Sequence, residues 1–113
     1  MKLCMIGTGY VGLVSGVCFS DVGNKVYCVD NDKKKIDLLN KGNVPIFEPG
    51  LEEILKKNQK QKRLIFTTNL KEAVKNSDII FICVGTPTKK NGNSADLKYV
   101  FNVANKLKKI IKK

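Results

Sequence analysis

Histidine is absent from this chain of 113 residues, and Arg63 is the single arginine among its 21 basic residues. The four cysteines, Cys4, Cys18, Cys28 and Cys83, form no Cys-x-x-Cys pair. A cysteine–histidine nucleophile is therefore excluded, and the ligand spacing of a zinc site is missing. We expect no metal centre, and we expect the cysteines to be buried, reduced thiols that pack as small apolar side chains.

The basic residues give the chain a formal net charge of +11, but they do not gather in one stripe. Twenty of them are lysines, and aromatic residues are not interleaved with them. Nucleic-acid sites usually combine arginines with aromatic side chains on which bases stack. The dense stretch 106–113 fits the end of an amphipathic helix, where cations favour the helix dipole. We therefore expect no specific nucleic-acid partner, only weak attraction to polyanions at low salt.

Long hydrophobic runs are also missing. No stretch approaches the length of a membrane-spanning helix, and the N-terminus lacks the pattern of a signal peptide. Hydrophobic residues make up 42% of the chain, which is ordinary for a globular protein. The length allows one domain with a small core. We expect a single domain over residues 1–113, in the cytoplasm and without a membrane partner.

A glycine-rich motif is the most informative feature that the chain does have. An apolar segment over 3–6 leads into Gly7-x-Gly9-x-x-Gly12, and a helical pattern follows. In dinucleotide-binding folds the first glycine permits a tight turn, the second lets the backbone approach a pyrophosphate, and the third lets the helix pack on the sheet. The pyrophosphate meets free N–H groups at the start of the helix, near Tyr10. A glycine turn that serves packing alone is the alternative.

An acidic residue favours the dinucleotide interpretation. A second apolar segment, 25–29, ends on Asp30, where the ribose of a bound dinucleotide would lie. Packing alone does not explain a carboxylate at this position. In a dinucleotide site, the carboxylate would accept hydrogen bonds from the ribose of NAD and repel the 2′-phosphate of NADP. Lysines 33–35 could clamp that phosphate, but they are more simply the exposed first turn of a helix capped by Asp32. We expect NAD.

The rest of the chain alternates between strand and helix patterns, which predicts a parallel sheet with helices on both faces. The fold class is α/β, a Rossmann-like doubly wound sheet of about four strands in the order 3-2-1-4, without strands five and six of the complete fold. The other expected elements are a helix over 32–40, a short helix whose first residue is Pro49, a strand over 64–67, a short helix capped by Asn69, a strand over 78–84 and a last helix.

Four expectations concern the last third of the chain. Segment 78–84 is a continuous apolar run, as expected of a central strand buried on both faces. Because strand five is missing, we expect the outer edge of this strand to be exposed. The turn Gly85-Thr86-Pro87 should face the glycine motif across the sheet end, with the Thr86 hydroxyl available to a nicotinamide or ribose group. Apolar residues of the last helix recur at helical spacing and should lie on the sheet. They are Leu97, Val100, Phe101, Ala104, Leu107 and Ile111.

Five motifs together are characteristic of one enzyme family. They are Gly7-Thr-Gly-Tyr-Val-Gly-Leu-Val-Ser-Gly-Val-Cys-Phe19, Val29-Asp-Asn-Asp-x-x-Lys-Ile36, Pro45-Ile-Phe-Glu-Pro-Gly-Leu51, Phe66-Thr-Thr-x-Leu70 and Phe81-Ile-Cys-Val-Gly-Thr-Pro87. The chain resembles the UDP-glucose/GDP-mannose dehydrogenase family over nearly its whole length, and the UDP-glucose members more than the GDP-mannose members. The Glu-Pro-Gly-Leu and Val-Gly-Thr-Pro blocks are the most specific to the family.

The resemblance implies an NAD-dependent enzyme that oxidises UDP-glucose to UDP-glucuronate with two NAD and one water. Through the shared motifs, it implies that Val11 binds NAD by its backbone, and that Asp30 holds the adenosine ribose with Lys35 beside it. Thr86 would approach the nicotinamide side. Tyr10 lies in the glycine motif and would line the same crevice.

The resemblance also implies what this chain does not contain. The family's catalytic glutamate, lysine, asparagine, aspartate and cysteine, and its UDP-sugar pocket, lie beyond the equivalent of Lys113. We therefore expect the truncated N-terminal portion of a homo-oligomeric enzyme, with no catalytic residue and inactive alone. The alternatives are a non-catalytic nucleotide-binding module and a dehydrogenase of a related nucleotide sugar such as GDP-mannose.

Overall fold

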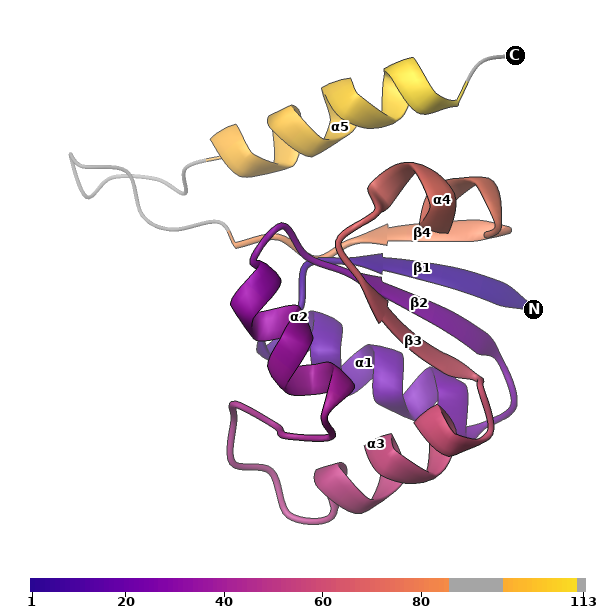
Figure 1. The fold of residues 1–113 in the computed structure, drawn as a ribbon. Coiled ribbons are helices and arrows are strands. Elements are labelled where there is room, and N and C mark those ends of the chain that lie inside the picture. Colours follow the sequence, from indigo (N-terminus) through magenta and orange to yellow (C-terminus); the bar gives the residue numbers. More distant parts are fainter. Residues whose placement is uncertain (86–96, 112–113) are drawn as a thin grey trace, which may run out of the picture.

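The computed structural model describes residues 1–85 and 97–111, and these form one four-stranded sheet with helices on both faces (Figure 1). All strand pairs are parallel, and the order is β3-β2-β1-β4, as expected. The elements are β1 (Lys2–Ile6), α1 (Tyr10–Asp21), β2 (Lys25–Val29), α2 (Lys33–Asn40), α3 (Leu51–Lys60), β3 (Leu64–Thr67), α4 (Leu70–Lys75), β4 (Ile79–Ile82) and α5 (Lys98–Ile110).

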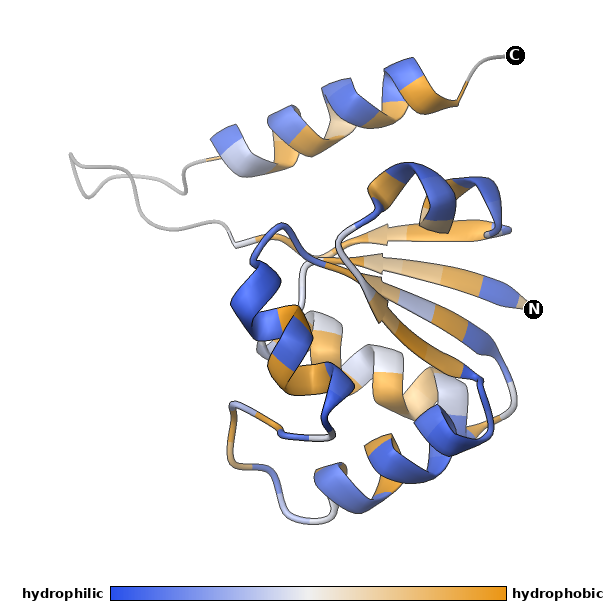
Figure 2. Cartoon of the chain, in the orientation of Figure 1, coloured by the Kyte–Doolittle hydropathy of each residue, from blue (hydrophilic) through white to orange (hydrophobic). Residues whose placement is uncertain are grey.

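The sheet separates two apolar cores. Successive side chains of a strand point to opposite faces, so Leu3 and Met5 of β1 pack with α1, α2 and α3, whereas Cys4 and Ile6 pack with α4 and α5. Figure 2 shows the strands as mostly orange bands between helices of mixed colour. Burial of the strands on both faces explains why their sequences are apolar with little alternation.

The direction of the strand connections reverses beside the glycine motif. β1 pairs with β2 on one side and with β4 on the other. The chain continues from β1 to β2 and β3, and then crosses to β4 on the opposite side of β1. The connections therefore diverge at the carboxyl ends of β1 and β4, which is where doubly wound sheets bind their ligands.

The helix starts confirm two of three sequence predictions. Asp32 accepts a hydrogen bond from the N–H of Lys35 at the start of α2, and Asn69 accepts one from Glu72 at the start of α4. The prediction that Pro49 begins the next helix is wrong, because α3 starts at Leu51 after Gly50 in the left-handed region (φ 82°). Among residues 1–85 and 97–111, no helix is long and apolar enough to cross a membrane.

The expectation that strand four is buried on both faces is also wrong. β4 is shorter than predicted, and its end residues Ile79 and Ile82 are 41% and 39% exposed. Within the described residues β4 pairs with β1 alone, so it is an edge strand, as expected from the missing strand five. An apolar sequence does not supply the neighbour that would cover its outer edge.

The contact face of α5 differs in part from the predicted one. Leu107 packs against the core as expected, but its companions are Val103 and Ile110. Phe101, placed on the sheet by its spacing, is 60% exposed. Leu97, Ala104 and Ile111, also placed on the sheet by their spacing, are exposed as well, because α5 packs mainly on α4.

The cysteines follow the expectation with one exception. Cys4 and Cys28 are buried, Cys83 is half-buried, and all four thiols are free. Cys18 is exposed, because the buried residues of α1 are on the side of the helix that faces the sheet and Cys18 lies on the opposite side. Burial raises the pKa of the Cys4 thiol to about 11, which keeps it protonated at neutral pH.

Candidate cofactor-binding site

Two of the three motif glycines are required by the fold itself. Gly7 has a φ of 104°, and a Cβ there would lie 2.7 Å from the carbonyl oxygen of Cys83. A Cβ on Gly12 would overlap the carbonyl oxygen of Gly7. These contacts fold the glycine loop tightly between the carboxyl ends of β1 and β4, as the roles of the first and third glycine require.

Gly9 has no such reason within the protein. Its φ of −71° is open to any residue, and a Cβ there would meet nothing within 4 Å. It is the N-cap of α1, where serine, threonine, aspartate, asparagine and glycine are favoured, and glycine alone of these leaves the helix without a side-chain cap. Gly9 thus leaves the backbone and the free N–H groups at the start of α1 uncovered. This is the role of the second glycine of the dinucleotide motif, which lets a pyrophosphate approach the backbone closely.

Asp30 lies directly beside the glycine loop, at the end of β2. Its Oδ2 accepts hydrogen bonds from the backbone N–H of Thr8 (3.0 Å) and from the Thr8 hydroxyl (2.7 Å). Its Oδ1 accepts one from the N–H of Asp32 (3.0 Å). A carboxylate has about four acceptor sites, so Asp30 can hold the loop and still accept a hydrogen bond from a ligand hydroxyl.

The surroundings of Asp30 keep it charged. Burial favours its neutral form, but the hydrogen bonds from Thr8 and Asp32 and the charge of Lys35 outweigh burial, so the pKa of Asp30 lies below its usual value. The ammonium of Lys35 is 3.9 Å from Oδ2. The carboxylate is therefore ionised at neutral pH, with 14% of its side chain accessible.

Tyr10 and Val11 begin α1 and are 55% and 66% exposed. The Tyr10 hydroxyl donates a hydrogen bond of 2.9 Å to Glu48, from the loop before α3. This bond and the charge of Glu48 raise the pKa of the Tyr10 phenol. The side chain of Tyr10 is thus held toward the loop, while the backbone at Val11 stays accessible at the helix start.

The structure brings together most of the residues predicted for the site. The loop between β1 and α1 and the first turn of α1 contain Gly7, Gly9, Tyr10, Val11 and Gly12. Asp30 and Lys35 contact each other beside this loop. Thr86 lies outside the described residues.

Sequence reasoning missed two residues, Thr8 and Glu48. Both sit inside recognised motifs, but their hydrogen bonds to Asp30 and Tyr10 join residues 22 and 38 positions apart.

A family model for the UDP-glucose/GDP-mannose dehydrogenase family, NAD binding domain, matches residues 1–113. The chain belongs to this family. The cofactor of this family domain is NAD, which agrees with the carboxylate at Asp30.

Known members of the family are close in sequence and in fold. The chain is 54% identical over 107 residues, 95% of its length, to a UDP-glucose 6-dehydrogenase of Rhizobium meliloti, of which it covers 24%. A GDP-mannose dehydrogenase from Pseudomonas aeruginosa, solved as a ternary complex, is 50% identical with a TM-score of 0.87, over 91% of this chain and 23% of that one. A UDP-glucose dehydrogenase from Pyrobaculum islandicum is 42% identical with a TM-score of 0.86, over 91% and 24%. The chain thus spans about a quarter of the length of these relatives.

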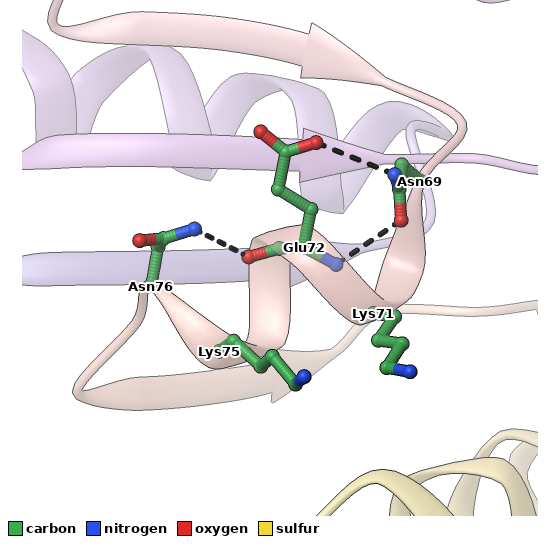
Figure 3. Close-up of a pocket in the computed structure, with 5 residues that line it drawn as sticks. All are labelled: Asn69, Lys71, Glu72, Lys75 and Asn76. Carbon is green, nitrogen blue, oxygen red and sulfur yellow. Dashed lines mark hydrogen bonds between the residues drawn. The ribbon is translucent and has the colours of Figure 1, made fainter.

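A depression lies away from the glycine loop. It measures about 270 Å³ and is formed on α4 (Figure 3). Glu72 donates its N–H to Asn69 and accepts at its carbonyl from Asn76, so the polar groups there serve the two ends of α4. Since α4 packs on the face of the sheet opposite α1, this depression does not contribute to the cofactor site. No group of three or more metal-binding side chains occurs in the part of the chain that the structure describes.

Proposed function

We propose that this chain provides the NAD-binding part of a UDP-glucose 6-dehydrogenase. The observation that carries the proposal is Gly9. The fold has room for a side chain at this position, whereas a bound pyrophosphate requires that there be none. The family membership and the 54% identity to a UDP-glucose 6-dehydrogenase support the same assignment.

We assign a role in NAD binding to each residue of the site. The N–H groups after Gly9, with the backbone of Val11, would hold the pyrophosphate at the positive end of α1. Asp30 would accept from the adenosine ribose, and Lys35 would stay beside it as its counter-charge. Gly7 and Gly12 shape the loop, Tyr10 lines it, and Thr86 is proposed for the nicotinamide side. NAD itself supplies the hydride acceptor.

The activity of the whole enzyme is proposed from its relatives. UDP-glucose would be oxidised to UDP-glucuronate by a longer, homo-oligomeric cytoplasmic protein, and we assign no catalytic residue to this chain. The 50% identity to a GDP-mannose dehydrogenase makes a related nucleotide sugar the second candidate substrate. A nucleotide-binding module without catalysis is the third possibility. The site described above is common to all three.

Titration calorimetry with NAD and NADP tests the proposal. We expect weak binding of NAD and weaker binding of NADP. Asp30→Ala should cost about 1–2 kcal/mol of NAD binding, the scale of hydrogen bonds to a charged group. Gly9→Ala should weaken NAD binding about tenfold while the variant remains folded, because its Cβ meets only the ligand. Equal affinity for NADP, or no effect of Gly9→Ala, would contradict the assignment.

A further inference from the structure

The cofactor-binding end of α1 has little to hold it in place. Gly9 offers no side-chain cap, and the first turn contains no acidic residue that would favour the helix dipole. The backbone bond from the N–H of Leu13 to the carbonyl of Gly9 (2.9 Å) is an ordinary helical bond. Since a cap would occupy the groups that the pyrophosphate needs, fixation of this turn must come from another part of the chain.

The bond from Tyr10 to Glu48 supplies that fixation. Glu48 is half-buried in the loop 44–50, which lines an open depression of about 520 Å³ before α3. The loop is itself anchored, because Val44 and Ile46 pack against the core. On its other side, the carbonyl of Glu48 accepts from the N–H of Leu51 (3.1 Å) at the start of α3. Tyr10 is thus tied to a segment that is fixed at both of its ends.

The opposite end of α1 is bonded to α3, the helix that follows this loop. Asp21 accepts hydrogen bonds from the Asn58 side chain (3.1 Å) and from Lys57 (3.2 Å) of α3. Asn58 is fully buried, and Arg63 donates to its amide oxygen and to the carbonyl of Ser20. α1 and α3 run in the same direction (Figure 1). A side-chain hydrogen bond holds each end of α1, one to Glu48 in the loop before α3 and one to Asn58 of α3.

We propose that Glu48 is a positioning residue for NAD: through Tyr10 it braces the first turn of α1 against α3, so that the free N–H groups stay directed at the pyrophosphate. The proposal rests on the proposed NAD site and adds a residue to it. Pre-organised donors bind without the entropic cost of ordering them, so the brace should strengthen NAD binding with little change in the contacts made to NAD.

Four variants separate the hydrogen bond from the charge of Glu48. Glu48→Gln and Glu48→Ala remove the same negative charge, but glutamine keeps an acceptor for the Tyr10 hydroxyl. In calorimetry, we expect Glu48→Ala and Tyr10→Phe each to weaken NAD binding about threefold to tenfold, the range for one lost hydrogen bond. Glu48→Gln should bind NAD as the unaltered chain does. The double variant, Tyr10→Phe with Glu48→Ala, should lose no more than either single change.

A second readout requires no ligand. Amide hydrogen exchange should accelerate in Glu48→Ala and Tyr10→Phe, but not in Glu48→Gln, at Leu13, whose N–H bonds the carbonyl of Gly9, and at Leu51, whose N–H bonds that of Glu48. Glu53→Ala is the matched control, because Glu53 lines the same depression and carries the same charge on α3. It should change neither the exchange nor the affinity for NAD.

The outcomes distinguish this proposal from the function on which it rests. If Asp30→Ala weakens NAD binding while Glu48→Ala and Tyr10→Phe do not, the brace is wrong and the NAD site stands. If Glu48→Gln loses as much affinity as Glu48→Ala, the charge acts and not the bond, which also overturns the brace. A chain that binds no NAD would contradict both, whatever the exchange rates show.

Discussion

The first β–α–β unit and the β4–α5 unit have similarly apolar strands but differ sharply in burial. Leu3 and Ile6 of β1 are 4% and 5% exposed, whereas Ile79 and Ile82 of β4 are 41% and 39% exposed. β1 has a strand on each side and a helix layer on each face, and β4 has one strand neighbour in the described residues. The comparison teaches that neighbours, more than hydropathy, decide how firmly an apolar segment is held. The proposed NAD site is built on the firmly held unit.

The largest expected effect is in the glycine loop of the first unit. Gly12→Ala places a Cβ against the carbonyl oxygen of Gly7, and backbone cannot move aside as a flexible side chain can. We expect a loss of about 3 kcal/mol or more in the free energy of unfolding, measured by urea denaturation. Gly9→Ala is the control and should cost about 1 kcal/mol, the usual penalty of alanine at an N-cap. Equal losses would mean that the loop is not packed as described.

The next prediction compares the helices of the two units. Leu13 of α1 is fully buried, and Phe101 of α5 is 60% exposed. Leu13→Ala should cost about 3 kcal/mol through lost burial and a residual cavity, whereas Phe101→Ala should change stability by less than about 0.5 kcal/mol. The same urea titration measures both. A large loss on Phe101→Ala would show that the outer face of α5 is covered in solution.

The exposed edge of β4 should also make the chain associate with itself. An apolar edge strand is a template for pairing with another chain, and the net charge of +11 opposes this only in part. We expect oligomers at micromolar concentration in size-exclusion chromatography with light scattering, and a shift toward monomer in Ile82→Lys. Phe101→Lys is the control for the face of α5. A monomeric unaltered chain with a cooperative melt would show that the edge is protected.

The smallest expected effect is a change with pH in the free energy of unfolding, through Asp30 in the first unit. Because the pKa of Asp30 is lower in the folded chain than its usual value, its ionisation stabilises the fold above the unfolded pKa. This contribution is lost as the pH falls through the folded pKa. In Asp30→Asn, the free energy of unfolding should therefore fall less steeply as the pH is lowered, as measured by unfolding at a series of pH values. An unchanged decline would assign the acid sensitivity to other carboxylates.

Local signals predicted local structure well. The caps at Asp32 and Asn69 were predictable because each bonds an N–H three residues away. Pro49 was misplaced because the neighbouring Gly50 adopts a left-handed conformation that sets the helix start. The dual role of Asp30 was not predictable from its position in a motif, since its bonds to Thr8 exist only because β1 and β2 lie side by side.

The sequence by itself determined the type and order of the elements, the four-strand order and the choice of NAD, because periodicity, glycine spacing and a terminal carboxylate act within short segments. Only the tertiary structure decided which apolar residues of α5 are covered. It also decided that α1 is bonded at one end to Glu48, in the loop before α3, and at the other end to Asn58 of α3. Those properties depend on which distant segments become neighbours, and no short stretch of sequence contains that information.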